Sequence, residues 1–227
     1  MKARLEPRIN LDGRTALETV IPLATPFIVF VDPASSCNFK CTFCPTGHRD
    51  MIAETGRFQG VMKLDVFQKV IDDLGEFEKP IKVLRMYKDG EPFLNKRIAD
   101  MVAYAKKSGH VDYIDTTTNG TFLSPDRVGP VLEAGIDKIN ISVDGMNEET
   151  YLRFTGFKFD FKKFVENIKW IDANKAIARS SSRFWPSSSP RRSARNSSTP
   201  SAITAIVSSL RTSRRAGRNS IWRRTPA

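Results

Sequence analysis

Three cysteines lie within eight residues of this chain: Cys37, Cys41 and Cys44. Their C-x3-C-x2-C spacing allows three thiolates to bind three corners of one iron–sulfur cube, because thiolates are the preferred protein ligands of such clusters. The chain contains no fourth cysteine. The fourth iron of a 4Fe-4S cluster would therefore stay open to a ligand that is not protein, which is what a catalytic metal centre needs.

Three further segments follow stretches with strand character, as the cysteine loop does. Residues 89–92 read Asp-Gly-Glu-Pro, residues 117–120 read Thr-Thr-Asn-Gly, and residues 141–145 read Ile-Ser-Val-Asp-Gly. The active sites of βα barrels are built from loops at the C-terminal ends of strands. We therefore expect all four segments to meet at one end of the sheet.

These segments resemble those of the radical S-adenosylmethionine (radical SAM) superfamily. The cysteine loop matches its C-x3-C-x-aromatic-C motif, with Phe43 as the aromatic residue, and residues 89–92 are similar to its Gly-Gly-Glu-Pro turn. Asp89 departs from that turn, since it stands where the family has the first glycine. The resemblance covers roughly residues 25–175. It points to the branch that often carries a C-terminal SPASM or twitch domain with auxiliary clusters, a part that we expect to be truncated or frameshifted here.

The resemblance implies a 4Fe-4S cluster on Cys37, Cys41 and Cys44 whose open iron binds S-adenosyl-L-methionine (AdoMet). An electron from the cluster, supplied by a donor such as flavodoxin or ferredoxin, would cleave AdoMet to a 5′-deoxyadenosyl radical that takes hydrogen from the substrate. That substrate could be a peptide, a sugar or a small metabolite. The cofactor-binding residues that the resemblance implies are Gly90, Glu91 and Pro92 at the methionine ammonium, Phe43 beside adenine, and Ser142, Asp144 and Asn119 near the ribose.

A structural zinc ion is the competing interpretation of the cysteines. His48 would be the fourth ligand, since a Cys44-x3-His48 spacing is a feasible reach. This interpretation leaves the other three segments without a role. Taken singly, Glu91 could also be a solvated turn residue, Phe43 a core residue, and Asn119 part of a turn dipeptide with the following glycine.

Strand and helix patterns alternate between residues 26 and 175. Strands are predicted at 27–31, 81–86, 111–116 and 138–143, and helices at 64–77, 95–107, 125–135, 148–153 and 161–171. The run at 27–31 is apolar throughout, which predicts a buried strand. Asn95 is expected to cap a helix that Gly109 ends. The order predicts an α/β fold with about four parallel βα units, a partial (βα) barrel that four strands cannot close, after an N-terminal extension at 1–25.

The last segment, residues 176–227, has a different composition. It contains 14 serines, 11 arginines, no lysine and no acidic residue, which is typical of a disordered basic tail. The change is abrupt and falls at the end of the last predicted helix. We therefore hypothesise that the reading frame changes near Asn174 or Lys175, so that the chain is a truncated remnant of a longer enzyme. A functional basic tail for nucleic acid, in a zinc-stapled binding protein, is the alternative.

Charge and cysteine usage exclude several classes of protein. The 11 arginines of the tail equal the whole net charge of +11, so residues 1–175 carry no electrostatic footprint for nucleic acid. Residues 1–10 lack the apolar run of a secretory signal, and the apolar stretch at 19–31 is too short to span a membrane. Three closely spaced cysteines make a poor disulfide framework and favour metal binding in a reducing compartment. We expect a cytoplasmic protein without a membrane or nucleic-acid partner.

Overall fold

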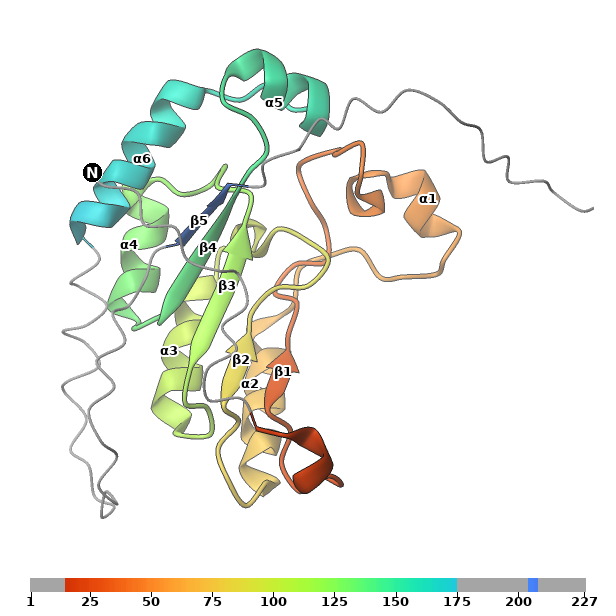
Figure 1. The fold of residues 1–227 in the computed structure, drawn as a ribbon, viewed down its shortest axis with the longest axis vertical. Coiled ribbons are helices and arrows are strands. Elements are labelled where there is room, and N and C mark those ends of the chain that lie inside the picture. Colours follow the sequence, from red (N-terminus) through yellow and green to blue (C-terminus); the bar gives the residue numbers. More distant parts are fainter. Residues whose placement is uncertain (1–14, 175–203, 208–227) are drawn as a thin grey trace, which may run out of the picture.

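The computed structural model describes residues 15–174 and 204–207, which form one parallel sheet with helices (Figure 1). The sheet has the order β1-β2-β3-β4-β5, and all neighbours are parallel. The strands are β1 (Ile28–Phe30), β2 (Val83–Arg85), β3 (Ile114–Thr118), β4 (Lys138–Val143) and β5 (Thr204–Val207). The α-helices are α1 (Arg49–Ala53), α2 (Leu64–Asp73), α3 (Ile98–Ser108), α4 (Pro125–Glu133), α5 (Glu148–Thr155) and α6 (Phe161–Asn174). Short 3-10 turns are η1 (Leu17–Thr19), η2 (Pro45–Gly47), η3 (Leu74–Glu76) and η4 (Pro92–Leu94). The alternation of strands and helices confirms the predicted α/β fold.

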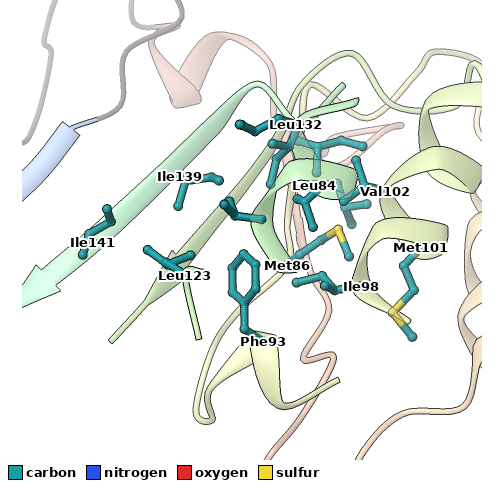
Figure 2. Packing of buried hydrophobic residues seen from close by; sticks show 14 of the residues in the cluster. Leu84, Met86, Phe93, Ile98, Met101, Val102, Leu123, Leu132, Ile139 and Ile141 are labelled. Atoms are coloured by element: carbon teal, nitrogen blue, oxygen red, sulfur yellow. The ribbon is translucent and has the colours of Figure 1, made fainter. Parts of the chain in front are cut away.

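The hydrophobic core fills the space between the sheet and its helices. Alternate residues of the strands, such as Leu84, Ile114 and Ile139, point toward the helices and are buried. Figure 2 shows Leu84 and Ile139 among side chains of α3 and α4, such as Val102 and Leu132. This packing fixes the helices to one face of the sheet and leaves the polar positions of the strands on the other.

Local sequence accounts for the ends of the helices. Gly109 has a left-handed backbone (φ +73°) and ends α3, as its position predicted. Asn147 caps α5: its side chain accepts a hydrogen bond from the backbone N–H of Thr150. Pro125 occupies the first turn of α4, where its missing N–H costs nothing.

Two predictions about these elements are wrong in detail. Strand β1 is not fully buried, because it lies at the edge of the sheet, and Ile28 and Phe30 are 41% and 49% exposed. Asn95 does not cap α3, whose N-cap is Arg97. The Asn95 side chain is instead buried, and its amide donates to the carbonyl oxygens of Pro33 and Met62 at 3.0 Å each.

The structure also adds a strand that the sequence did not predict. Residues 204–207 pair in parallel with β4, although the composition of the 176–227 segment predicted no strand there. The difference has a local cause, since β-branched residues are concentrated at this point of the segment. The rest of the predicted tail, and residues 1–14 of the predicted N-terminal extension, lie outside the described residues. None of the described helices is both long enough and apolar enough to cross a membrane.

Candidate functional site: the cysteine loop and the strand ends

The cysteine loop follows β1 and is held against the end of α5. The backbone N–H of Lys40 donates to the carbonyl oxygen of Thr155 at 2.7 Å, and that of Thr42 donates to Phe154 at 3.0 Å. Within the loop, the backbone N–H of Cys44 donates to the carbonyl oxygen of Cys41 at 3.1 Å. All three cysteines are half-buried and carry free thiols.

Phe39 anchors the middle of the loop in an aromatic cluster. Its side chain is 2% exposed, and its ring centroid lies 5.2 Å from that of Phe157, 6.2 Å from that of Phe159 and 6.5 Å from that of Tyr151. The cluster comes from α5 and the segment leading into α6. Because Phe39 lies between Cys37 and Cys41, this packing fixes the positions of both thiols.

At two glycines the backbone lies so close to the cysteine loop and the residues before it that any side chain would clash. A Cβ at Gly90 would lie 1.8 Å from the carbonyl oxygen of Ala34 and 2.6 Å from that of Ser36. A Cβ at Gly47 would lie 1.8 Å from the carbonyl oxygen of Phe39. Since neither position has room for a side chain, the 89–92 turn and the end of η2 both pack directly on the backbone of residues 34–39.

Glu91 connects the 89–92 turn to the end of β3. Its side chain is 2% exposed. One carboxylate oxygen, Oε1, accepts hydrogen bonds from the hydroxyl of Thr118 at 2.7 Å and the backbone N–H of Phe93 at 3.0 Å, and Oε2 accepts one from the backbone N–H of Asn119 at 2.7 Å. Burial raises the pKa of Glu91 to about 7, an effect that these three donors oppose. Glu91 is therefore not the solvated turn residue that its position beside a proline allowed.

Asn119 continues this network to the first cysteine. Its side-chain amide lies 3.8 Å from the sulfur of Cys37 and donates to the side-chain oxygen of Asn38 at 2.9 Å. The backbone N–H of Phe39 also donates to the sulfur of Cys37, at 3.4 Å. Donors that point at a ligand sulfur stabilise its thiolate and tune a bound cluster.

Asp32, two residues after the end of β1, accepts a hydrogen bond from the 89–92 turn. The backbone N–H of Asp89 donates to its carboxylate at 3.4 Å. Burial raises the pKa of Asp32, and the backbone N–H groups of Lys88, Asp89 and Gly90 act in the opposite direction. The side chain of Asp89, which replaces a glycine of the resembled motif, forms an ion pair with Arg57 at 3.5 Å. An aspartate is thus accommodated at this position by a partner from the segment after α1.

The remaining predicted residues lie around the same end of the sheet. Phe43 is 63% exposed, so the interpretation of its ring as core packing is wrong. Ser142 and Asp144 are half-buried and, two residues apart, leave the same face of β4 and its extension. The charge of Asp144 is close enough to raise the pKa of Cys41. Pro92, the last residue of the 89–92 turn, is buried in the first position of η4.

The comparison with known families decides the assignment. The model that describes the radical SAM superfamily matches residues 31–177, which is more than half of the chain. The chain belongs to the radical SAM superfamily. The matched region contains the cysteine loop, the 89–92 turn and the ends of β3 and β4. Members of the superfamily use a 4Fe-4S cluster and AdoMet.

Individual radical SAM relatives cover the same part of the chain. It is 26% identical over 144 residues to an AdoMet-dependent heme synthase of Methanosarcina barkeri, covering 63% of this chain and 38% of that protein. It is 30% identical over 137 residues to a GTP 3′,8-cyclase of Vibrio atlanticus, covering 60% of this chain and 38% of the relative. The chain thus spans little more than a third of the length of these relatives.

Two solved structures show the same fold. Native anSMEcpe with bound AdoMet superposes with a TM-score of 0.51 at 21% identity, over 66% of this chain and 42% of that one. Streptococcus suis SuiB bound to S-adenosylmethionine gives a TM-score of 0.51 at 14% identity, over 69% of this chain and 32% of that one. At these identities the comparison supports the fold, a partial radical SAM barrel, and carries no information on the substrate.

The donor set of the loop fits an iron–sulfur cluster better than a single metal ion. Burial raises the pKa of Cys37, and it raises the pKa of Cys41 to about 12; a bound cation would favour their thiolate forms. Within the described residues, no group of three or more His, Cys, Asp or Glu side chains is placed to hold one metal ion. A cube takes each thiolate on a different iron, so its thiolates surround one cluster without sharing a single metal ion. The ring nitrogen Nε2 of His48 lies 3.2 Å from the carbonyl oxygen of Cys41, an acceptor, so no observation supports the zinc interpretation.

Several residues of the site were not predicted from the sequence. Asp32 accepts a hydrogen bond from the turn, Asn38 of the loop accepts one from Asn119, and Thr118 donates one to Glu91, as described above. Asp32 could have been found, because it follows a strand as the other site residues do. Phe39 and Gly47 could not, since their roles depend on packing against residues distant in sequence.

Proposed function

We propose that this chain is the core of a radical SAM enzyme, at residues 26–175, that cleaves AdoMet reductively and starts hydrogen abstraction from a substrate. Cys37, Cys41 and Cys44 would ligate the cluster. When bound, the cluster and AdoMet supply an electron and a carbon-centred radical. The chain's own residues bind and orient these groups.

One observation carries the proposal: the three thiols lie on a loop that the surrounding structure fixes in place. Phe39 packs in the aromatic cluster, Gly47 and Gly90 contact the loop backbone, and Asn119 links Cys37 to the buried carboxylate of Glu91. A fixed geometry supports a catalytic centre, because the reacting atoms of a bound cofactor must be held in register.

The same geometry supports a set of proposed AdoMet contacts. Since the Glu91 side chain is engaged by three donors, we assign the methionine ammonium to the backbone carbonyl groups of the turn that Gly90 and Pro92 shape, with Glu91 positioning that turn. The exposed ring of Phe43 would contact adenine. Ser142 and Asp144, with Asn119, would bind the ribose hydroxyls.

The partners of this enzyme follow from the reaction class. We propose an electron donor of the flavodoxin or ferredoxin kind and a substrate that is a peptide, a sugar or a small metabolite. We also propose a cytoplasmic location, since three closely spaced cysteines favour metal binding in a reducing compartment. We propose no membrane partner, and no nucleic-acid partner because the net charge of residues 1–175 is zero.

Anaerobic reconstitution with iron and sulfide tests the proposal. We expect a brown protein with about four irons per chain, and 5′-deoxyadenosine on addition of dithionite and AdoMet. Ala substitution of Cys37, Cys41 or Cys44 should abolish both. The matched control is His48→Ala, which should keep the iron; iron binding that depends on His48, or zinc in place of iron, would overturn the proposal.

A further inference from the structure

The face of the sheet opposite the helices carries a row of side chains from four neighbouring strands. The backbone register places Phe30 beside Arg85, Arg85 beside Asp115, and Asp115 beside Lys138. Side chains alternate along a strand, so these residues share the face that Leu84 and the rest of the core do not use. Helices α3 and α4 lie on the other side of the sheet (Figure 1).

The contacts of this row combine aromatic and charged groups. The guanidinium carbon of Arg85 lies 5.5 Å from the ring centroid of Phe30, and its Nε lies 3.6 Å from Oδ2 of Asp115. Tyr87 extends the aromatic surface, since its ring meets that of Phe30 edge to face at 6.1 Å. The row therefore presents an exposed aromatic surface next to planar polar side chains.

Three polar atoms on this face are buried without a hydrogen-bond partner in the described chain. They are Oδ1 of Asp115, Oδ1 of Asn140 and Nε of Arg85. Asp115 is 6% exposed and Asn140 is 5% exposed. The amide nitrogen of Asn140 donates to the carbonyl oxygen of Thr116 at 3.2 Å and to the hydroxyl of Thr117 at 3.4 Å, which orients the amide and leaves its oxygen free.

A ligand that satisfies these atoms must both donate and accept. A carboxylate or phosphate only accepts hydrogen bonds, so it would leave the oxygens of Asp115 and Asn140 without a donor. An ammonium group only donates, so it would leave Nε of Arg85 without an acceptor. Hydroxyl groups do both from one oxygen, whereas an amide donates and accepts from separate atoms. A buried polar group without a partner costs free energy, so the site should prefer a ligand that both donates and accepts hydrogen bonds.

The position of the site relates it to the proposed AdoMet pocket. Asn140 precedes Ser142 by two residues on β4, so the two side chains share a face and lie about 7 Å apart along the strand. A molecule bound at Asn140 would thus lie directly beneath the residues assigned to the ribose.

We propose that Asp115, Asn140 and Arg85 bind the hydroxyl groups of a sugar or sugar-like part of the substrate, whose C–H face lies on Phe30 and Tyr87. The role of this site in catalysis rests on the proposed function. Among the three substrate classes above, this assignment commits to the polyhydroxylated one; a peptide, whose amides also donate and accept, is the alternative that the amide probe tests.

Saturation-transfer NMR on the full chain tests the site without requiring turnover. The probes are methyl α-D-glucopyranoside, sodium acetate and N-acetylglycinamide, each with and without AdoMet. We expect transfer to the glucoside, reduced at least fivefold by Asn140→Leu and by Asp115→Asn. The matched controls Asn167→Leu on α6 and Asp126→Asn on α4 should keep the signal.

The outcomes separate this inference from the proposed function. Stronger transfer to acetate or to the amide, or a glucoside signal that the Asp115→Asn variant keeps, overturns the sugar site. Asp115→Asn preserves the size of the side chain. It therefore tests the sugar site even if the Asn140→Leu variant fails to fold. A chain that binds the glucoside but no iron would refute the proposed function alone, and a chain that binds iron and AdoMet but no glucoside would refute the inference alone.

Discussion

The hydroxyl of Thr118 donates a 2.7 Å hydrogen bond to the buried carboxylate of Glu91, which joins the end of β3 to the turn that follows β2. Replacing Thr118 with Val keeps the shape of the side chain and removes this donor. We expect the free energy of unfolding to fall by about 1–3 kcal/mol, because a buried carboxylate loses one of its partners. Urea denaturation measures the change. Thr19→Val, which removes an exposed hydroxyl bonded to Ala16, is the control and should cost less.

The Glu91 carboxyl makes stability depend on pH before iron is added. Burial raises its pKa from 4.5 to about 7. The native chain then binds more protons than the unfolded chain in this range, so the contribution of Glu91 is fully present below about pH 4.5 and is lost as the pH rises to about 7. We expect the wild type to lose stability relative to Glu91→Gln over this window. Urea denaturation at both ends measures it, and parallel profiles for the two proteins would refute the shift.

Gly90 is the position where the smallest substitution should have the largest effect on the site. In Gly90→Ala the new methyl group would lie 1.8 Å from the carbonyl oxygen of Ala34, so the turn or the cysteine loop must move. We expect reconstituted iron to fall at least fivefold, as measured by a colorimetric iron assay. In the control, Gly129→Ala within α4, the nearest atom to the new methyl group outside the local helix is on Trp170 at 3.7 Å, and reconstituted iron should be unchanged.

Phe39 should contribute mainly through packing. Phe39→Ala removes a ring that touches three aromatic neighbours, and we expect a loss of about 3–5 kcal/mol of unfolding free energy. Phe39→Leu should recover part of this loss and restore iron binding. Phe58→Ala is the control, since Phe58 is 73% exposed. Equal losses in the two alanine variants would show that the cluster does not anchor the loop.

The sequence predicted the parts of this structure that depend on local pattern. The spacing of the cysteines, the four βα units and the glycine that ends α3 are all legible in short stretches of chain. The edge position of β1 and the buried role of Asn95 were not, because both depend on which strands and loops become neighbours. Glu91 illustrates the difference: its motif marked it as functional, but only the fold shows that Thr118 and Asn119 hold its carboxylate inside. Whether the predicted ligands and AdoMet contacts act as proposed stays a prediction for the experiments above.

The hydrogen bond from Lys40 to Thr155 joins two ends of the described core, since the loop follows the first strand and Thr155 ends the fifth helix. This sets an order of assembly. The hydrogen bond that holds the loop requires the chain through Thr155, so under the proposed function we expect the thiols to be fully arranged only after that residue has been synthesised. Under the proposed function, iron would therefore be bound after synthesis of this part of the core, and not by the emerging N-terminal part.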